Sequence, residues 1–259
     1  MTRLAAALSA LTLVLAACGS TTPPPPTGLA SVATAAAGDL TVELLTDKAL
    51  GTGLTPIYLK ITTASGAAVT DATVTFEPLM TMPTMSHTCP VMGPPALTAG
   101  GLYATAAVFQ MASGAMGTWS ATVGVTRPAA ATKTATFANL QVADTGLART
   151  FENGTSKFVV SLSFQQGPAV GLNPVVVTLH ETTDMGMTFA PVNDATVKLD
   201  PQMPSMGHGS VGSIDPLKVS DGRYEGKLSF SMAGTWVTTL TLSRPGIDPL
   251  GSVAITTTF

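Results

Sequence analysis

The sequence predicts an all-β protein built from two β-sandwiches in tandem. The first observation is an internal repeat, in which short motifs recur in the same order with a period above about 100 residues, as in duplicated domains rather than a solenoid. The second is that the segments between motifs are short, rich in Val, Thr and aromatic residues, and punctuated by Gly or Pro, which is typical of strands. The third is that no helical period follows residues 1–17. Six or seven strands in about 100 residues favour an immunoglobulin-like sandwich for each domain.

Residues 1–17 are expected to be a lipoprotein signal peptide. Arg3 is followed by an apolar run that ends in Leu-Ala-Ala before Cys18, and such a segment is typical of secretory signals. A cysteine at this place resembles the bacterial lipobox, which implies cleavage before Cys18 and lipidation of that residue. An ordinary signal peptide with a chance cysteine is the alternative. Several acyl chains would anchor the protein to a bacterial membrane, and Gly19, in place of Asp, favours the outer membrane or the periplasmic face over the inner membrane.

Residues 18–37 are expected to form a flexible tether rich in Pro, Ala and Thr. Pro23–Pro26 favour an extended polyproline conformation, and the segment has too little apolar bulk to pack. The first domain is then expected at 38–138 and the second at 151–259, joined by a linker at 139–150.

The repeat is carried by five motifs. In the first and second domain these are Asp71–Pro78 and Asp194–Pro201, Met82–His87 and Met203–His208, Gly101–Tyr103 and Gly222–Tyr224, Phe109–Met111 and Phe230–Met232, and Gly117–Trp119 and Gly234–Trp236. Side chains two residues apart on a strand share a face, and this parity predicts that Trp119, Trp236, Met111 and Met232 are core residues. His180 is expected to be structural.

The two strings of the form Met-Pro-Ser/Thr-Met-x-His are the strongest candidate sites. Thioether and imidazole ligands suit Cu(I), whereas Zn favours thiolates and imidazoles. The predicted metal ligands are Met82, Met85, His87 and Cys89 in the first domain, and Met203, Met206 and His208 in the second. An extended chain after Pro83 would put Met85, His87 and Cys89 on one face, with Cys89 as a candidate thiolate, while a turn at each proline brings the first methionine round. Alternatively, the methionines fill the open end of each sandwich and the histidines are solvated.

Composition and motifs exclude other functions. Only 10% of residues are charged and the formal net charge is −3, so no basic surface for nucleic acid is expected. No motif of a nucleophile elbow, zinc protease or nucleotide-binding loop occurs, and no orienting third group accompanies His87 and Cys89; the protein is therefore not expected to be an enzyme. With Cys18 lipidated, Cys89 is the only thiol, which leaves no intramolecular disulfide.

The order of these motifs resembles the YtkA-like / FixH-like family of exported β domains, most clearly over residues 152–245. The resemblance implies small, immunoglobulin-like, non-enzymatic domains, and copper handling through the Met/His string. We therefore expect a membrane-anchored extracytoplasmic lipoprotein that binds Cu(I) for storage, transfer or protection, with a copper-handling or envelope-protein partner. The alternative is a structural or protein-interaction module of the cell envelope that binds no metal.

Overall fold

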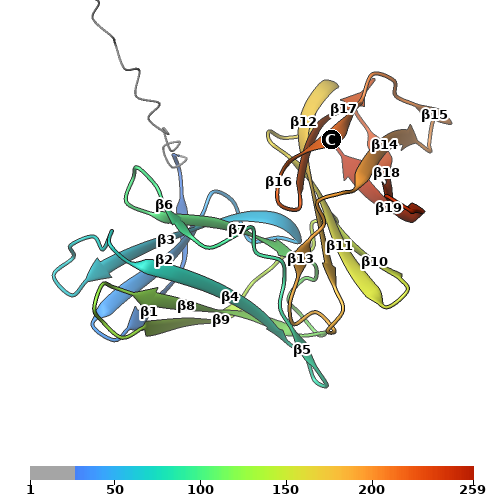
Figure 1. Cartoon of the computed structure of the whole chain (residues 1–259). Coiled ribbons are helices and arrows are strands. Elements are labelled where there is room, and N and C mark those ends of the chain that lie inside the picture. Colours follow the sequence, from blue (N-terminus) through green and yellow to red (C-terminus); the bar gives the residue numbers. More distant parts are fainter. Residues whose placement is uncertain (1–26) are drawn as a thin grey trace, which may run out of the picture.

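The computed structural model describes residues 27–259, which form two β-sandwiches in tandem (Figure 1). The predicted signal peptide and the predicted lipidation site at Cys18 lie outside the described residues. No α-helix occurs within residues 27–259. Accordingly, this part of the chain contains no helix of the length and apolar character that a membrane span requires. The all-β prediction and the prediction of two tandem immunoglobulin-like sandwiches are confirmed.

The first sandwich packs a five-stranded sheet, in the order β1-β2-β3-β7-β6, against a four-stranded sheet, in the order β5-β4-β8-β9. The strands are β1 (Ala30–Ala37), β2 (Leu40–Thr46), β3 (Gly53–Thr63), β4 (Thr73–Thr81), β5 (Ser86–His87), β6 (Ala96–Leu97), β7 (Tyr103–Phe109), β8 (Thr118–Thr126) and β9 (Lys133–Leu140). One hydrophobic core, drawn from both sheets, lies between them.

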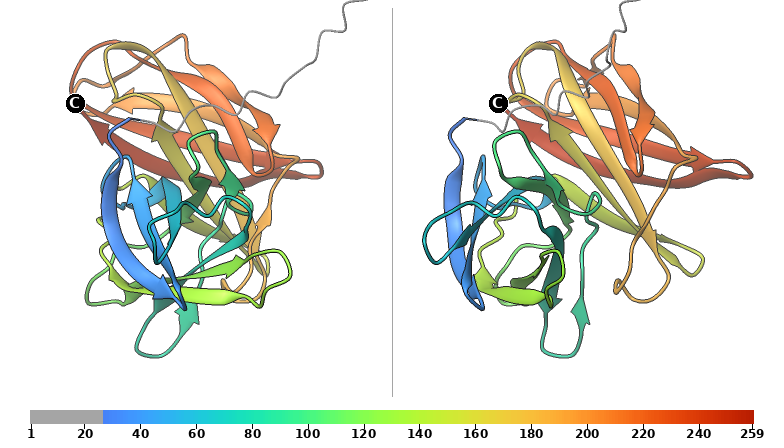
Figure 2. Two further views of the ribbon diagram at one scale, coloured as in Figure 1. Left: turned by 90° about the vertical axis from the view of Figure 1, so that its left-hand side faces the viewer. Right: turned by 60° about the vertical axis from the view of Figure 1, so that its left-hand side comes forward.

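The second sandwich repeats this arrangement. Its larger sheet has the order β10-β11-β12-β17-β16, with β13 paired to β12, and its smaller sheet has the order β15-β14-β18-β19. The strands are β10 (Ala148–Asn153), β11 (Ser156–Phe164), β12 (Gly171–Thr182), β13 (Ala190–Pro191), β14 (Thr196–Met203), β15 (His208–Gly209), β16 (Ile214–Ser220), β17 (Arg223–Phe230), β18 (Thr235–Arg244) and β19 (Ile247–Thr258). Figure 2 shows this domain, in yellow to red, beside the first domain, in blue to green.

Alternating side chains build both cores. Strand β4 alternates exposed and buried residues along most of its length, as expected of an antiparallel strand with one solvated face. Trp119 on β8 and Trp236 on β18 are fully buried, as predicted. Each tryptophan packs against the last residue of the preceding strand, which belongs to the other sheet of the sandwich: the Phe109–Trp119 centroids lie 5.0 Å apart and the Phe230–Trp236 centroids 5.3 Å apart.

The predicted tether is wrong for residues 30–37, which form strand β1. This strand pairs with β2 from Ala30 opposite Thr46 to Ala37 opposite Leu40. Its small side chains supply little apolar bulk. Backbone hydrogen bonds to β2 hold it in the sandwich, and the Ala37 side chain is fully buried in the core. The first sandwich therefore begins before residue 38.

The linker is shorter than predicted and is hydrogen-bonded to the first domain. Strand β9 ends at Leu140 and β10 begins at Ala148, so residues 141–147 connect the domains rather than 139–150. The Ala143 N–H donates to Leu50 O at 3.0 Å, and the Thr52 N–H donates to Ala143 O at 2.9 Å. These backbone bonds were not visible in the sequence because their partners lie about 90 residues away.

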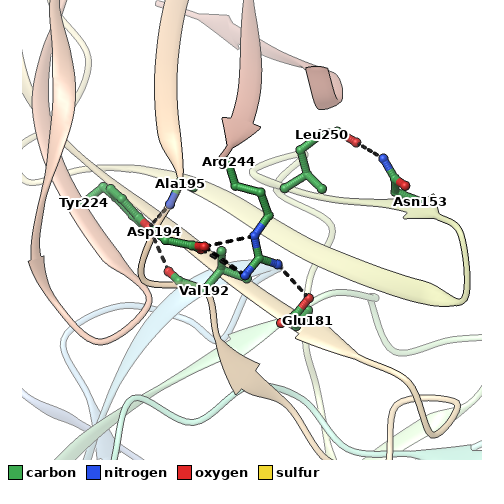
Figure 3. Close-up of polar contacts among 8 residues, drawn as sticks. All are labelled: Asn153, Glu181, Val192, Asp194, Ala195, Tyr224, Arg244 and Leu250. Atoms are coloured by element: carbon green, nitrogen blue, oxygen red, sulfur yellow. Dashed lines mark hydrogen bonds and ion pairs between the residues drawn. The ribbon is translucent and has the colours of Figure 1, made fainter. Parts of the chain in front are cut away.

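An arginine–aspartate pair stabilises the same end of the smaller sheet in both domains. Arg127 donates to both carboxylate oxygens of Asp71, at 3.0 and 2.8 Å, and these bonds lower the pKa of the Asp71 carboxyl. In the second domain, Arg244 lies 3.0 Å from Asp194 and 3.2 Å from Glu181 (Figure 3). The two aspartates lie just before the first residues of β4 and β14, at the opposite end of these strands from the Met/His strings.

A tyrosine hydroxyl beside each ion pair secures the chain that enters the same strand. Tyr103 accepts a hydrogen bond from the Ala72 N–H at 2.9 Å. Tyr224 accepts one from the Ala195 N–H at 3.1 Å and donates to Val192 O at 2.8 Å (Figure 3). The repeated Gly-x-Tyr motif therefore has a structural role.

Candidate functional site

A cross-strand row of histidine, methionine and tryptophan occupies one end of each smaller sheet. In the first domain, His87 on β5 pairs with Met80 on β4, and Met80 pairs with Trp119 on β8. Directly paired residues present their side chains on the same face of a sheet. Met80 and Trp119 are fully buried, so this row faces the interior of the sandwich.

The second domain has the same row. His208 on β15 pairs with Met203 on β14. The β14–β18 ladder pairs Gln202 with Val237, which places Met203 beside Trp236. Met203 is 3% exposed and Trp236 is fully buried. The duplication therefore preserves a three-residue arrangement as well as a sequence motif.

Each histidine packs its ring against the tryptophan of its row. The ring centroids of His87 and Trp119 lie 5.5 Å apart with an interplanar angle of 82°, and those of His208 and Trp236 lie 5.8 Å apart at 73°. His87 is 6% exposed, whereas His208 is half-buried. The alternative that the histidines are solvated is therefore wrong for His87, whereas His208 combines its edge-to-face contact with a partly exposed ring.

The Nδ1 atom of each histidine faces the carbonyl of the next residue. The distance is 2.8 Å from His87 Nδ1 to Thr88 O and 3.1 Å from His208 Nδ1 to Gly209 O. A proton on Nδ1 donates to this carbonyl and leaves the lone pair on Nε2, as in many metal-binding histidines. His87 Nε2 is buried and has no hydrogen-bond partner among the described residues.

A glutamine contact bears on the choice of tautomer in the first domain. Gln110 Nε2 lies 2.8 Å from Thr88 O and 2.9 Å from His87 Nδ1. A hydrogen bond donated by the Gln110 amide to His87 Nδ1 would require the ring proton to lie on Nε2, where it would be buried without an acceptor. We favour the Nδ1-protonated form, because His208 keeps the carbonyl contact although Ser231 replaces the glutamine.

The glycine of each Gly-Thr-Trp motif makes room for the methionine. A Cβ atom on Gly117 would lie 3.0 Å from both Met80 Cε and Met82 Cγ, and one on Gly234 would lie 2.9 Å from Met203 Cε. These separations are too short for a side chain to be added without displacement. Two thioether side chains, those of Met80 and Met82, therefore approach Gly117 in the first domain.

Sequence reasoning missed Met80, which occupies in the first domain the place that Met203 has in the second. The predicted equivalent was Met82, which starts the repeated string. Asp71–Met80 and Asp194–Met203 align without a gap and both end in Pro-x-Met. This alignment was the signal for Met80, because it moves the two extra residues of the first copy into the β4–β5 hairpin.

The other methionines of the strings lie at hairpin tips. The Met82 N–H donates to Met85 O at 2.9 Å, and the Met206 N–H donates to Met203 O at 3.1 Å, so a turn does follow each proline as expected. Met85 is 43% exposed and Met206 is 60% exposed. Both are exposed to solvent, unlike Met80 and Met203.

Cys89 lies in the hydrophobic core of the first sandwich, where burial raises the pKa of its thiol. The neutral thiol is thus the favoured form, which argues against the predicted thiolate.

Met111 packs against the same core, but Met232 is 40% exposed, and the prediction of a core role is wrong for Met232. Met232 O accepts a hydrogen bond from the Trp236 indole at 3.0 Å, as Met111 O does from the Trp119 indole at 2.9 Å, so the backbone position is repeated although the burial of the side chain is not.

The third histidine, His180, is buried on β12, and desolvation lowers its pKa to about 4. Within residues 27–259, no three His, Cys, Asp or Glu side chains gather in the way that a metal site built from these four residue types requires. The candidate sites therefore combine a single imidazole with thioether sulfur.

Comparisons with known proteins identify the family. The YtkA-like family model matches residues 34–124 and 152–241, one region in each sandwich. No curated protein matches. Among solved structures, the chain is similar to FdeC, described as a broadly conserved Escherichia coli adhesin, with 16% identity and a TM-score of 0.26 over 85% of this chain. The chain spans 64% of that adhesin chain. Because the family model covers most of both domains, the protein belongs to the YtkA-like family, with two such domains in tandem.

Proposed function

We propose that the protein is an extracytoplasmic lipoprotein that binds Cu(I) at its two Met/His rows, for storage, transfer or protection. The observation that carries this proposal is the unpartnered Nε2 of His87, which is buried beside methionine and has its other ring nitrogen directed at a carbonyl. A buried polar atom without a partner costs free energy unless a ligand or water satisfies it. A soft metal ion would do so.

The donor set favours Cu(I) over other metals. Met80, Met82 and His87 would hold the ion in the first domain, and Met203, Met206 and His208 in the second. These side chains are uncharged, and transfer of a doubly charged ion into such an apolar environment would be much more costly than transfer of a singly charged one. Thioether sulfur also selects against hard cations such as Mg²⁺ and Ca²⁺.

The two sites differ in access. His87 is buried, whereas His208 is half-buried and is followed by an exposed glycine. The site in the first domain (site one) is therefore suited to retaining the ion, and the site in the second domain (site two) is suited to exchanging it with a copper-handling partner in the cell envelope. A lipid anchor at Cys18 would hold both near the membrane.

An anaerobic Cu(I) titration against a chromophoric chelator tests the proposal. The wild type is compared with His87→Phe, His208→Phe and the double variant, because phenylalanine keeps a ring against the tryptophan and removes the nitrogen ligand. We expect uptake of two equivalents at these rows, one of which is lost in each single variant. His180→Gln is the matched control, and it should bind as the wild type does. Equal uptake by the wild type and the double variant would refute the proposal.

The second candidate function is a metal-independent protein-interaction module of the envelope. It is favoured by the edge strand β16, where Ile214, Leu217 and Val219 are all half exposed or more. An edge strand with apolar side chains can pair with a strand of another protein. Replacement of Leu217 by Lys should abolish capture of an envelope partner under this function and leave Cu(I) uptake unchanged.

A further inference from the structure

A cavity of about 330 Å³ between the two domains is lined by a methionine from each. Met85 reaches it from the β4–β5 hairpin of the first domain, and Met185 reaches it from the β12–β13 loop of the second. Glu152 and Lys157 lie on its wall, at paired positions of β10 and β11. Neither Met185 nor this cavity belongs to the Met/His rows.

Met185 is held in a conformation that is costly for an ordinary loop residue. Its φ angle is 59°, in the left-handed region that side chains other than glycine rarely adopt, and 81% of its surface is exposed. Backbone strain of this kind tends to mark functional positions.

Hydrogen bonds to Asp184 brace the loop that carries Met185. Asp184 Oδ1 accepts hydrogen bonds from the N–H groups of Met187 and Thr188, both at 3.0 Å, and from the Thr182 hydroxyl at 2.7 Å. The hydrogen bond from the Thr188 hydroxyl, followed by those from the Thr188 N–H, the Thr182 hydroxyl and the Met187 N–H, lowers the pKa of the Asp184 carboxyl. The loop therefore holds Met185 in place at neutral pH without help from a ligand.

The same loop is docked on the hairpin that carries Met85. The Thr88 N–H donates to Gly186 O at 2.8 Å, and the Thr88 hydroxyl lies 3.0 Å from Met187 O. A Cβ atom on Gly186 would lie 3.2 Å from His87 Cβ, so the backbones are in close contact. Figure 1 shows β13 and β5 at this junction. The two methionines are thus presented by segments with a fixed mutual position.

We propose that Met85 and Met185 form a third soft-cation site, located between the domains, which takes Cu(I) or its chemical analogue Ag(I) through thioether sulfur. The choice of cation follows the proposed function, but the ligands are different, and this site binds whether or not the histidine sites do. An ion held here joins the two sandwiches, since its ligands come from both. Glu152 and Lys157 place one charge of each sign on the cavity wall, so the preference for a soft cation rests on the two thioether groups.

Silver titration of the His87→Phe/His208→Phe variant tests this site, because Ag(I) is soft and stable in air. The methionine methyl groups are labelled with ¹³C and followed by NMR. We expect one remaining equivalent of Ag(I), with the Met85 and Met185 methyl signals shifting together and saturating at the same ratio. Met85→Leu and Met185→Leu should each abolish this equivalent, since leucine keeps the volume and removes the sulfur. Met187→Leu, in the same loop but outside the cavity, should retain it.

Two results would overturn the inference: no uptake by the double histidine variant, or Met85 and Met185 signals that titrate independently. The proposed function is judged separately, from the difference between the wild type and the histidine variant. If both proteins bind the same amount and lose it with Met185→Leu, the interdomain site stands and the Met/His rows do not bind metal.

Discussion

His87 and Trp119 lie edge to face, with their ring centroids 5.5 Å apart, and His208 and Trp236 repeat this contact in the second domain. The chain has only these two tryptophans. Each indole is therefore a reporter for the histidine of its own domain. This one-to-one relation makes the two sites separable by fluorescence.

Metal bound at a Met/His row should change the emission of one tryptophan. In Trp119→Phe the remaining signal comes from the second domain alone, and Ag(I) should alter it in proportion to occupancy of His208. Adding His208→Phe to that variant should abolish the response. A response that persists without His208 would show that the metal acts on Trp236 from elsewhere.

Met80→Leu should weaken metal uptake at site one about tenfold or more while leaving the fold intact. Leucine replaces methionine at similar volume, so the free energy of unfolding should change by less than about 1.5 kcal/mol. The measurement is a chelator competition paired with urea denaturation. Met111→Leu is the control, since Met111 packs on the same core from the β7–β8 connection. Unchanged affinity in Met80→Leu would remove this residue from the ligand set.

Gly117→Ala should destabilise the protein by about 1–3 kcal/mol, the usual cost of forcing extra atoms into a packed site. The added Cβ would lie 2.6 Å from Thr81 O and 3.0 Å from Met80 Cε. Denaturant unfolding provides the measurement, and Gly167→Ala is the matched control because no atom lies within 4 Å of its Cβ position. Equal stability of the two variants would contradict the close packing of Thr81 O and Met80 Cε around Gly117.

His180 should make stability fall as pH decreases from about 6.5 to about 4. Its pKa is lowered to about 4 by desolvation, so in this window the unfolded chain binds a proton that the folded chain does not. Protonation therefore favours unfolding, by on the order of 3 kcal/mol across the window. Denaturation at each pH should show the stability of the wild type falling relative to that of His180→Gln as the pH decreases over this range. Parallel curves would mean that His180 remains protonatable in the folded state.

The periodic pattern was enough to predict the sandwiches, because alternating apolar residues and the repeated Trp119 and Trp236 depend on local spacing. Strand β1 was missed because alanine-rich segments pack through backbone pairing more than through apolar bulk. The role of Met80 was missed because the extra residues of the first copy were placed before the hairpin rather than within it. The burial of His87 Nε2 and the interdomain cavity arise from contacts between distant segments, which no local pattern encodes.

The strands β4 and β8 carry the Asp71–Arg127 ion pair at one end and the Met80–Trp119 pair at the other. Strands β14 and β18 have the same division, with Asp194–Arg244 opposite Met203. Substitutions at the methionine end therefore leave the anchoring of the opposite end untouched. The two copies therefore differ in the length of the hairpin at the methionine end while each keeps the ion pair at the other end. The ion-pair end of each smaller sheet is thus shared by the two domains, whereas the hairpin end differs between them.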